Sequence, residues 1–295
     1  MRDLELALLV QAQGSIAGAA RVLDLDPSSV SRSLSALEAE LGVRLFHRTT
    51  RKLSTTEEGA AYLQRVAPLV EEMRAAAQAA SGARQAPSGT LRMTASVAFA
   101  CQMLVTVLPA FSERYPEISV ELISSDANLD LVEQGIDLAV RLAPAPKGDL
   151  VSSKLMDTRY HLVASPAYLA RVGGVKTPEG LRDHNCLRYA LPGFGDVWRF
   201  RSDAEPFEVR VTGRHKFSNA LALLEAAREG LGVALLADWL VAEDLAAGRL
   251  VELCPRYQGT VSDFETAAWV LYPNRRYLPR KTRVMIDFLR ESLAG

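Results

Sequence analysis

The chain has 295 residues, 48% of them hydrophobic, and a formal net charge of −1 from 34 basic and 35 acidic side chains. This length predicts roughly two or three domains, and the composition is typical of a globular protein and not of a disordered one. The balanced charge excludes a uniformly basic coat for nucleic acid, although it is compatible with a local basic patch.

The sequence carries no pattern typical of a membrane or secreted protein. No apolar run approaches the roughly 18 residues that span a bilayer. Asp3 and Glu5 occupy the region where a secretion signal carries positive charge. We therefore expect a cytoplasmic protein that does not bind membranes.

Motifs of common enzymes and metal sites are absent from the sequence. It has no CxxC, HExxH, GxxxxGK(S/T) or GxSxG motif, and its four histidines are scattered. The odd number and wide spacing of the cysteines favour a reducing compartment and structural thiols over a redox pair. We predict no catalytic residue, no metal and no cofactor. The cysteines and histidines concerned are Cys101, Cys186, Cys254, His47, His161, His184 and His215.

The first 42 residues predict three short helices. An apolar first helix ends near Gly14, and Ser15 can cap a second helix over 16–23. After a tight turn, Asp26 is a good N-cap and Pro27 suits the first position of a third helix. That helix runs to Leu41 and stops at Gly42. Its apolar residues lie on one stripe that we expect to be buried: Val30, Leu34, Leu37 and Leu41.

The opposite face of the third helix carries small hydroxyls and one arginine. Small hydroxyl side chains let a helix approach DNA closely, and an arginine can bridge phosphate or guanine. Two helices joined by a tight turn are typical of a helix-turn-helix, although an ordinary solvated face is equally compatible with this helix alone. The candidate DNA-binding residues here are Ser28, Ser29, Ser31, Arg32 and Ser35.

The next segment, 42–56, contains four basic residues and no acidic one. Its composition around a turn predicts two short strands, as in a wing beside a helix-turn-helix. A chance cluster of basic residues is the alternative. The four added DNA-binding candidates are Arg44, Arg48, Arg51 and Lys52.

Residues 56–80 predict one long helix, with Thr55 and Glu58 at capping-box spacing and a kink at Pro68. Apolar residues recur at alternating spacings of three and four, which predicts either a dimer seam or a helix packed on its own domain. The seam residues are Leu63, Val66, Val70, Met73 and Ala77. The small, polar residues of 81–89 predict a hinge.

From Leu91 onward, strands alternate with helices, which is typical of an α/β fold. We predict strands over 91–95, 119–124 and 136–142, and helices over 102–114, over 129–134 and from near Ala220.

Three strings resemble the LysR-type transcriptional regulators: AGAARVL at 17–23, VSRSLSALEAELGVRLFHRTTR at 30–51 and LSTTEEG at 53–59. Later strings also resemble this family, namely SPAYL at 165–169, TPEGL at 177–181 and EAAREGLGV at 225–233. One departure concerns Pro27, which stands where many members carry a base-reading glutamine. Pro27 has no side-chain donor or acceptor and cannot read a base.

The resemblance implies an α+β multidomain fold. A winged helix-turn-helix would occupy 1–58, a dimerisation linker helix and hinge 59–88, and a two-lobed, periplasmic-binding-protein-like effector domain 89–295. Lobe one would comprise 91–161 and 266–295, and lobe two 162–265. The partners implied are double-stranded DNA, a small-molecule effector, RNA polymerase, and further copies of the chain in a homodimer or a homotetramer.

In two-lobed α/β proteins, ligands bind beyond the carboxyl ends of the strands. Helix N-termini favour an anion there, so we expect an organic acid. The serines among these residues could instead cap helices and face solvent. The effector-binding candidates are Ser96, Phe99, Ser125, Arg141, Ser218 and Asn219.

The sequence therefore predicts a transcriptional regulator of the LysR type, controlled by an effector between two lobes, and not an enzyme. The alternative is a solute-binding or enzymatic two-lobed domain without a transcriptional role.

Overall fold

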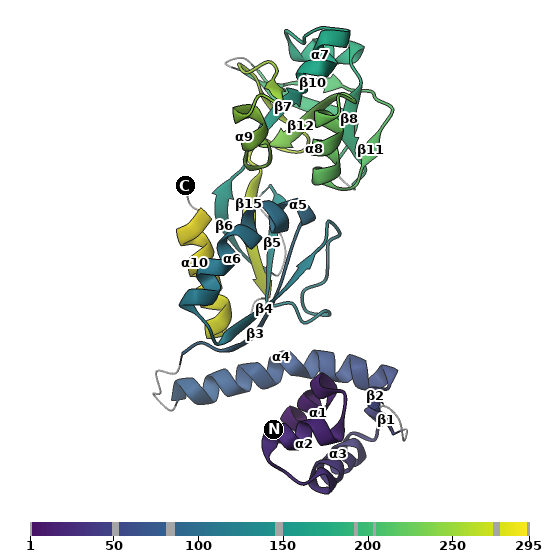
Figure 1. Cartoon of the computed structure of the whole chain (residues 1–295), viewed down its shortest axis with the longest axis vertical. Helices are drawn as coiled ribbons and strands as arrows, with labels where there is room; N and C mark the ends of the chain where they lie inside the picture. The colour runs from purple at the N-terminus through teal and green to yellow at the C-terminus, as the bar shows by residue number, and fades with distance from the viewer. Residues whose placement is uncertain are drawn as a thin grey trace. The chain divides into compact units, whose positions relative to one another are not determined.

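The computed structural model describes residues 2–48, 53–80, 86–144, 150–191, 194–202, 205–273 and 278–293. The chain forms two compact units (Figure 1). The N-terminal unit extends to Ala86 and includes the segments 129–136 and 275–280, and the effector unit contains the rest.

No single helix among the described residues is long and apolar enough to cross a membrane. Two consecutive helices, Asp3–Gln13 and Ile16–Leu23, together have the length and apolar composition of a membrane span, but they are bent by 120° relative to each other. Both helices contribute residues to the core of the N-terminal unit, including Ala7, Val10 and Ala19.

Three short helices build the N-terminal unit as the sequence predicts: α1 (Arg2–Gln13), α2 (Ile16–Leu23) and α3 (Pro27–Leu41). The Ser15 hydroxyl accepts a hydrogen bond from the Gly18 N–H, and Gly42 ends α3 at φ +70°. Because apolar residues recur on one face of each helix, the faces meet in one core. That core includes Val30, Leu34 and Leu37 from α3.

A two-stranded wing follows, with β1 (Phe46–Arg48) antiparallel to β2 (Leu53–Thr55). The long helix α4 (Glu57–Ala80) comes next and packs against α1. The predicted capping pair is wrong, because Thr55 pairs with Phe46 in the wing. The cap is Thr56, whose hydroxyl accepts the Gly59 N–H at 2.8 Å.

Lobe one is a five-stranded sheet of order β4-β3-β5-β15-β6. β3 is parallel to β4 and β5, while β15 is antiparallel to β5 and β6. The C-terminal helix packs through Phe288 against Phe111, with ring centroids 5.2 Å apart. The bounds are β3 (Gly89–Ala95), α5 (Val97–Phe99), a π-helical turn (Ala100–Leu104), α6 (Val105–Arg114), β4 (Ile118–Ser124), β5 (Leu138–Ala143), β6 (Leu150–Asp157), β15 (Ala267–Pro273) and α10 (Arg280–Leu293).

Two predicted helices between these strands differ from the structure. Helical structure after β3 begins at Val97, five residues before the predicted start at Gln102. The predicted helix over 129–134 is wrong, because this segment forms a turn. The Asp130 carboxylate accepts the Val132 and Glu133 N–H groups, and Gly135 at φ +61° ends the turn before a second helical turn forms.

Lobe two is built on an eight-stranded sheet of order β10-β9-β14-β7-β12-β8-β11, with β13 paired to β7. Helices α8 and α9 pack against β12. The bounds are β7 (Tyr160–Ala164), α7 (Pro166–Val172), a 3-10 helix (Pro178–Asp183), β8 (Cys186–Tyr189), β9 (Val197–Arg201), β10 (Phe207–Arg210), β11 (Lys216–Phe217), α8 (Ala220–Arg228), β12 (Val233–Ala237), α9 (Asp238–Ala246), β13 (Val251–Glu252) and β14 (Gln258–Thr260).

The chain crosses between the lobes twice, after β6 and before β15. The first crossover precedes Tyr160, because all of β7 pairs with strands of lobe two. It therefore lies slightly earlier than the boundary at 161 that the resemblance implies.

Candidate functional site

The polar face of α3 is presented to solvent. Ser28, Arg32 and Ser35 are exposed, and Ser29 and Ser31 are half-buried. Arg32 Nη2 donates to Ser29 Oγ at 3.2 Å, and the Ser35 hydroxyl donates to the Ser31 carbonyl at 2.9 Å. These contacts hold the polar side chains on one exposed face, since the apolar stripe of α3 is buried on the other.

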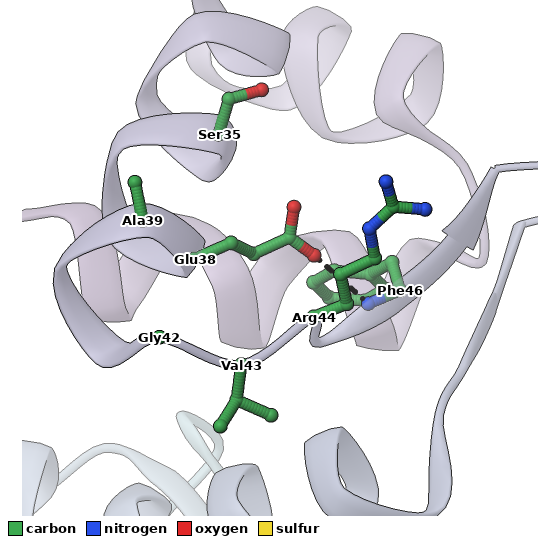
Figure 2. Close-up of a pocket in the computed structure, with 7 residues that line it drawn as sticks. All are labelled: Ser35, Glu38, Ala39, Gly42, Val43, Arg44 and Phe46. Atoms are coloured by element: carbon green, nitrogen blue, oxygen red, sulfur yellow. Dashed lines mark hydrogen bonds between the residues drawn. The ribbon is translucent and has the colours of Figure 1, made fainter.

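The wing is fixed to α3 by a residue that the sequence analysis missed. Glu38 Oε1 accepts hydrogen bonds from the N–H groups of Leu45 at 2.8 Å and Phe46 at 3.1 Å (Figure 2). A cavity of about 380 Å³ lies beside this contact and includes Ser35, Gly42 and Arg44 in its lining. The sequence could have indicated this role, because Glu38 lies near the C-terminal end of α3. The helix dipole disfavours a negative charge there unless hydrogen-bond donors approach it.

A second contact ties the wing to α4. The Thr56 hydroxyl donates to the Arg44 carbonyl at 2.6 Å, while its oxygen accepts the Gly59 N–H. A Cβ at position 59 would lie 2.1 Å from the Leu45 carbonyl oxygen, so only glycine permits this approach. The backbone from the Arg44 carbonyl to Phe46 is therefore fixed.

The basic residues of the wing are described in part. Arg44 is exposed, and Arg48 lies at the end of β1. The side chain of Arg48, and Arg51 and Lys52 altogether, lie outside the described residues.

The predicted seam on α4 divides into buried and exposed positions. Leu63 is fully buried in the core of the N-terminal unit, and Val70 is 3% exposed. Val66 is half-buried, whereas Met73 is 54% exposed. Leu69, which the seam did not include, is 56% exposed and lies one turn before Met73. The side chain of Ala77 lies outside the described residues.

A cavity of about 780 Å³ lies between the two lobes of the effector unit. Five of the six predicted effector residues line it: Ser96, Ser125, Arg141, Ser218 and Asn219. Phe99 does not, because it is 1% exposed and packs edge-on against Trp239 of lobe two, with ring centroids 5.3 Å apart. Phe99 therefore supports the cavity wall through its contact with Trp239, which lines the cavity.

Arg141 is the one arginine or lysine among the described residues that line this cavity. Its Nη2 donates to Thr94 Oγ1 at 3.2 Å and to the Ala127 carbonyl at 3.4 Å, and its Nη1 donates to the Val140 carbonyl at 3.3 Å. All three acceptors are neutral oxygens. Burial lowers the pKa of Arg141, and the Asp126 carboxylate opposes that shift.

Asp126 joins the two lobes across the cavity. Its Oδ1 accepts the Val97 N–H at 3.2 Å, and its Oδ2 accepts Asn219 Nδ2 at 2.9 Å. The Asn219 Oδ1 in turn accepts the Leu221 and Ala222 N–H groups at the start of α8. The protein's own side chains therefore already accept the N–H groups of Val97, Leu221 and Ala222 at these helix starts.

Aromatic side chains form much of the remaining wall. Tyr160, Tyr189, Phe194 and Trp239 line the cavity, and the rings of Tyr189 and Phe194 lie 5.0 Å apart. Burial, and then the charge of Asp238, raises the pKa of Tyr160 to about 12, and burial also raises the pKa of Tyr189. Both phenols are neutral at pH 7, so the wall offers apolar surface and neutral hydroxyls.

The three cysteines are free thiols. Cys186 and Cys254 are buried, which raises the pKa of the first to about 12 and of the second to about 11. Cys101 is exposed on the π-helical turn. Among the described residues no group of three His, Cys, Asp or Glu side chains has the arrangement of a metal site.

A winged helix-turn-helix with an exposed polar recognition face, followed by two α/β lobes around a cavity, defines a ligand-responsive DNA-binding regulator. Two family models match the chain. Residues 1–60 match the bacterial regulatory helix-turn-helix protein, lysR family, and residues 84–294 match the LysR substrate binding domain.

Relatives and a solved structure are similar along the whole chain. The probable HTH-type transcriptional regulator LtrA of Klebsiella pneumoniae is 33% identical over 99% of this chain and 94% of that protein. The regulator CrgA of Neisseria meningitidis is 34% identical over 99% of this chain and 97% of its own length. The structure of CrgA superposes with a TM-score of 0.64 at 32% identity, covering 100% of this chain and 99% of that chain.

The chain belongs to the LysR family of bacterial transcriptional regulators. It is a DNA-binding regulator with a family effector-binding domain, and it is not an enzyme. The predicted family, fold class and function are thereby confirmed.

Proposed function

We propose that α3 and the wing bind operator DNA through the nine residues selected from the sequence. The hydroxyls and Arg32 on α3 enter the major groove, while the basic residues of the wing neutralise phosphates. The observation that carries this proposal is the exposure of Ser28, Arg32 and Ser35 on a helix whose other face is buried. The residues concerned are Ser28, Ser29, Ser31, Arg32, Ser35, Arg44, Arg48, Arg51 and Lys52.

The test uses duplex DNA selected from a random library by the full chain. Arg32→Ala weakens binding to this DNA by about tenfold, because one charged contact is lost. Arg182→Ala, which removes an exposed arginine from lobe two, leaves the affinity unchanged. Equal affinities for Arg32→Ala and the unmodified chain would exclude α3 as the reading helix.

The cavity between the lobes takes the effector, an organic acid whose carboxylate meets Arg141. Support comes from the guanidinium, which lines the cavity and whose described partners are neutral oxygens. A charge-assisted hydrogen bond to a carboxylate is stronger than a neutral one. Ser96, Ser125, Ser218 and Asn219 add polar contacts, and Phe99 holds the wall.

Thermal denaturation of the full chain in a panel of mono- and dicarboxylic acids, with and without an amino group, tests this placement. At least one acid raises the melting temperature, and Arg141→Ala abolishes that rise, whereas Arg182→Ala preserves it. If no acid stabilises the unmodified chain, or if Arg141→Ala responds equally, the effector site is elsewhere or takes another chemistry.

The chain acts as a homodimer or a dimer of dimers held in part by α4. Met73 and Leu69 are more than half exposed, so a second copy of α4 would remove this apolar surface from water. Val66 and Ala77 extend the seam, whereas Leu63 and Val70 support it from inside the unit. Met73→Glu halves the mass seen by sedimentation, and an unchanged mass would place the contact elsewhere.

In the cytoplasm, RNA polymerase is the partner of the DNA-bound oligomer.

A further inference from the structure

The cavity between the lobes carries two opposite charges that are not paired with each other. Asp126 and Arg141 both line it, and within the described chain no ion pair joins them. They are close enough for the Asp126 carboxylate to influence the pKa of Arg141. A ligand between them therefore meets a negative and a positive group together.

Asp126 is placed to accept further hydrogen bonds. Each of its oxygens accepts one described hydrogen bond, from Val97 N–H and Asn219 Nδ2. A carboxylate has about four acceptor positions, so both oxygens retain acceptor capacity. A simple carboxylic acid bound at Arg141 would bring a second negative charge near this carboxylate, and like charges in one partly buried site repel each other.

The other described residues of the wall carry no further charge. Tyr160 and Tyr189 are neutral, and the other described lining residues beyond the serines and amides are apolar or aromatic. The site thus combines one anion receptor, one cation receptor and an aromatic surface. Its volume of about 780 Å³ is large enough for a metabolite with a hydrophobic side chain.

We propose that the effector is a zwitterionic amino acid with an apolar side chain. Its carboxylate binds Arg141, its ammonium group binds Asp126, and its side chain packs on the aromatic wall. This inference rests on the proposed effector site and names the class of acid that the site takes. Asp126 is then the residue that separates amino acids from simple acids.

The test compares molecules that differ by one charge. The full chain is melted with L-phenylalanine, 3-phenylpropanoate or phenethylamine, and with L-leucine, 4-methylpentanoate or isopentylamine. At least one amino acid stabilises the chain with an apparent affinity about tenfold or more above that of both its single-charge analogues, because one charge-assisted contact is lost in each. This arm of the test uses only the unmodified chain.

A second arm uses Asp126→Asn, with Asp157→Asn as a control that changes an exposed acid outside the lining of the cavity. Asp126→Asn removes the preference for the amino acid over the simple acid, while Asp157→Asn retains it. Melting without ligand reports whether either variant is folded.

Two outcomes would overturn the proposal. If the simple acids stabilise the unmodified chain as well as the amino acids do, the site binds acids and only this inference fails. If neither class stabilises it, both the inference and the proposed acid site fail.

Discussion

The two units position their candidate sites by different kinds of contact. In the N-terminal unit, side chains bond to backbone groups nearby in the sequence, from Ser15 to Gly18 and from Glu38 to Leu45, seven residues away. In the effector unit, contacts between distant segments are added to such local ones. Asp126 and Asn219 are 93 residues apart, and Lys281 and Thr90 are 191 apart.

This difference shows which interactions maintain each site. A recognition helix and wing depend on caps and anchors that form within one short stretch of chain. The cavity between the lobes depends on polar pairs, such as Asp126 and Asn219, that exist only after the chain has crossed from lobe one to lobe two. Variants at each kind of contact should therefore affect one unit and leave the other intact.

The largest effect is expected at the buried pair of Lys281 and Asp137 in lobe one. Both side chains are 7% exposed, with Lys281 Nζ 3.2 Å from Asp137 Oδ2. Lys281→Met destabilises the effector unit by about 3–5 kcal/mol, because it removes the cation beside a buried carboxylate. All three tryptophans lie in lobes one and two, so their fluorescence during urea denaturation reports this unit alone.

The matched control is Arg114→Met at an exposed pair. Arg114 and Glu291 are 52% and 57% exposed, so water screens their attraction and Arg114→Met changes the stability little. Equal losses for the two variants would contradict the account, as would a change in the DNA affinity of folded Lys281→Met.

A smaller effect, dependent on pH, is expected at Asp244 in lobe two. Its side chain is fully buried, and Arg228 and Arg249 hydrogen-bond to it. Burial opposes ionisation, but hydrogen bonds and charge from the two arginines hold the pKa of Asp244 below its usual range. Asp244→Asn costs about 1.5–3 kcal/mol at pH 7, since charge-assisted hydrogen bonds are lost.

The lowered pKa of Asp244 fixes the sign of the pH dependence. This stabilisation is present above the unfolded carboxyl pKa of about 3.9 and is lost as pH falls through the lower folded value. Below about pH 4, the unmodified chain therefore loses stability more steeply than Asp244→Asn. Parallel curves from urea titrations at pH 3–7 would show that Asp244 does not contribute this stability.

In the N-terminal unit, Glu38→Ala should loosen the wing. It leaves the Leu45 and Phe46 N–H groups without the acceptor they use. DNA binding weakens about tenfold, while tryptophan-detected stability of the effector unit does not change. Glu38→Gln retains an acceptor oxygen and recovers most of the affinity. If Glu38→Ala binds DNA normally, the wing does not need this anchor.

The smallest effect separates two adjacent threonines. Thr56→Ala removes the cap of α4 and its bond to the Arg44 carbonyl, which costs about 1 kcal/mol. Thr55→Ala, at the position that the sequence favoured, stays within about 0.5 kcal/mol. Helicity followed by circular dichroism at 222 nm during urea denaturation of the full chain compares the two. If Thr55→Ala lowers the stability more than Thr56→Ala does, Thr55 is the cap.

The N-terminal unit was predictable because its determinants are local. The spacing of Val30, Leu34 and Leu37 indicated the buried stripe, and Ser15 and Gly42 indicated helix ends that the structure confirms. The shift from Thr55 to Thr56 illustrates the limit of this approach. Both threonines suit a cap, and the pairing of Thr55 with Phe46 in the wing decides between them.

The cavity was predictable in outline only. Strand ends indicated Ser125 and Arg141 because carboxyl ends of parallel strands meet at one edge. Asp126 follows Ser125 at the same strand end, but its hydrogen bond to Asn219 was not predictable, since Asn219 comes from the other lobe. The buried position of Phe99 depends in the same way on Trp239.

The salt dependence of DNA binding tests most directly the claim that α3 and the wing carry the DNA contacts. Five basic residues per subunit, Arg32, Arg44, Arg48, Arg51 and Lys52, predict a slope of log K against log salt of about −5 to −9 for a dimer. Arg32→Ala flattens this slope, whereas Arg141→Ala in the effector unit leaves it unchanged. A slope flatter than about −2 would contradict the account, because the basic wing would then not lie on DNA.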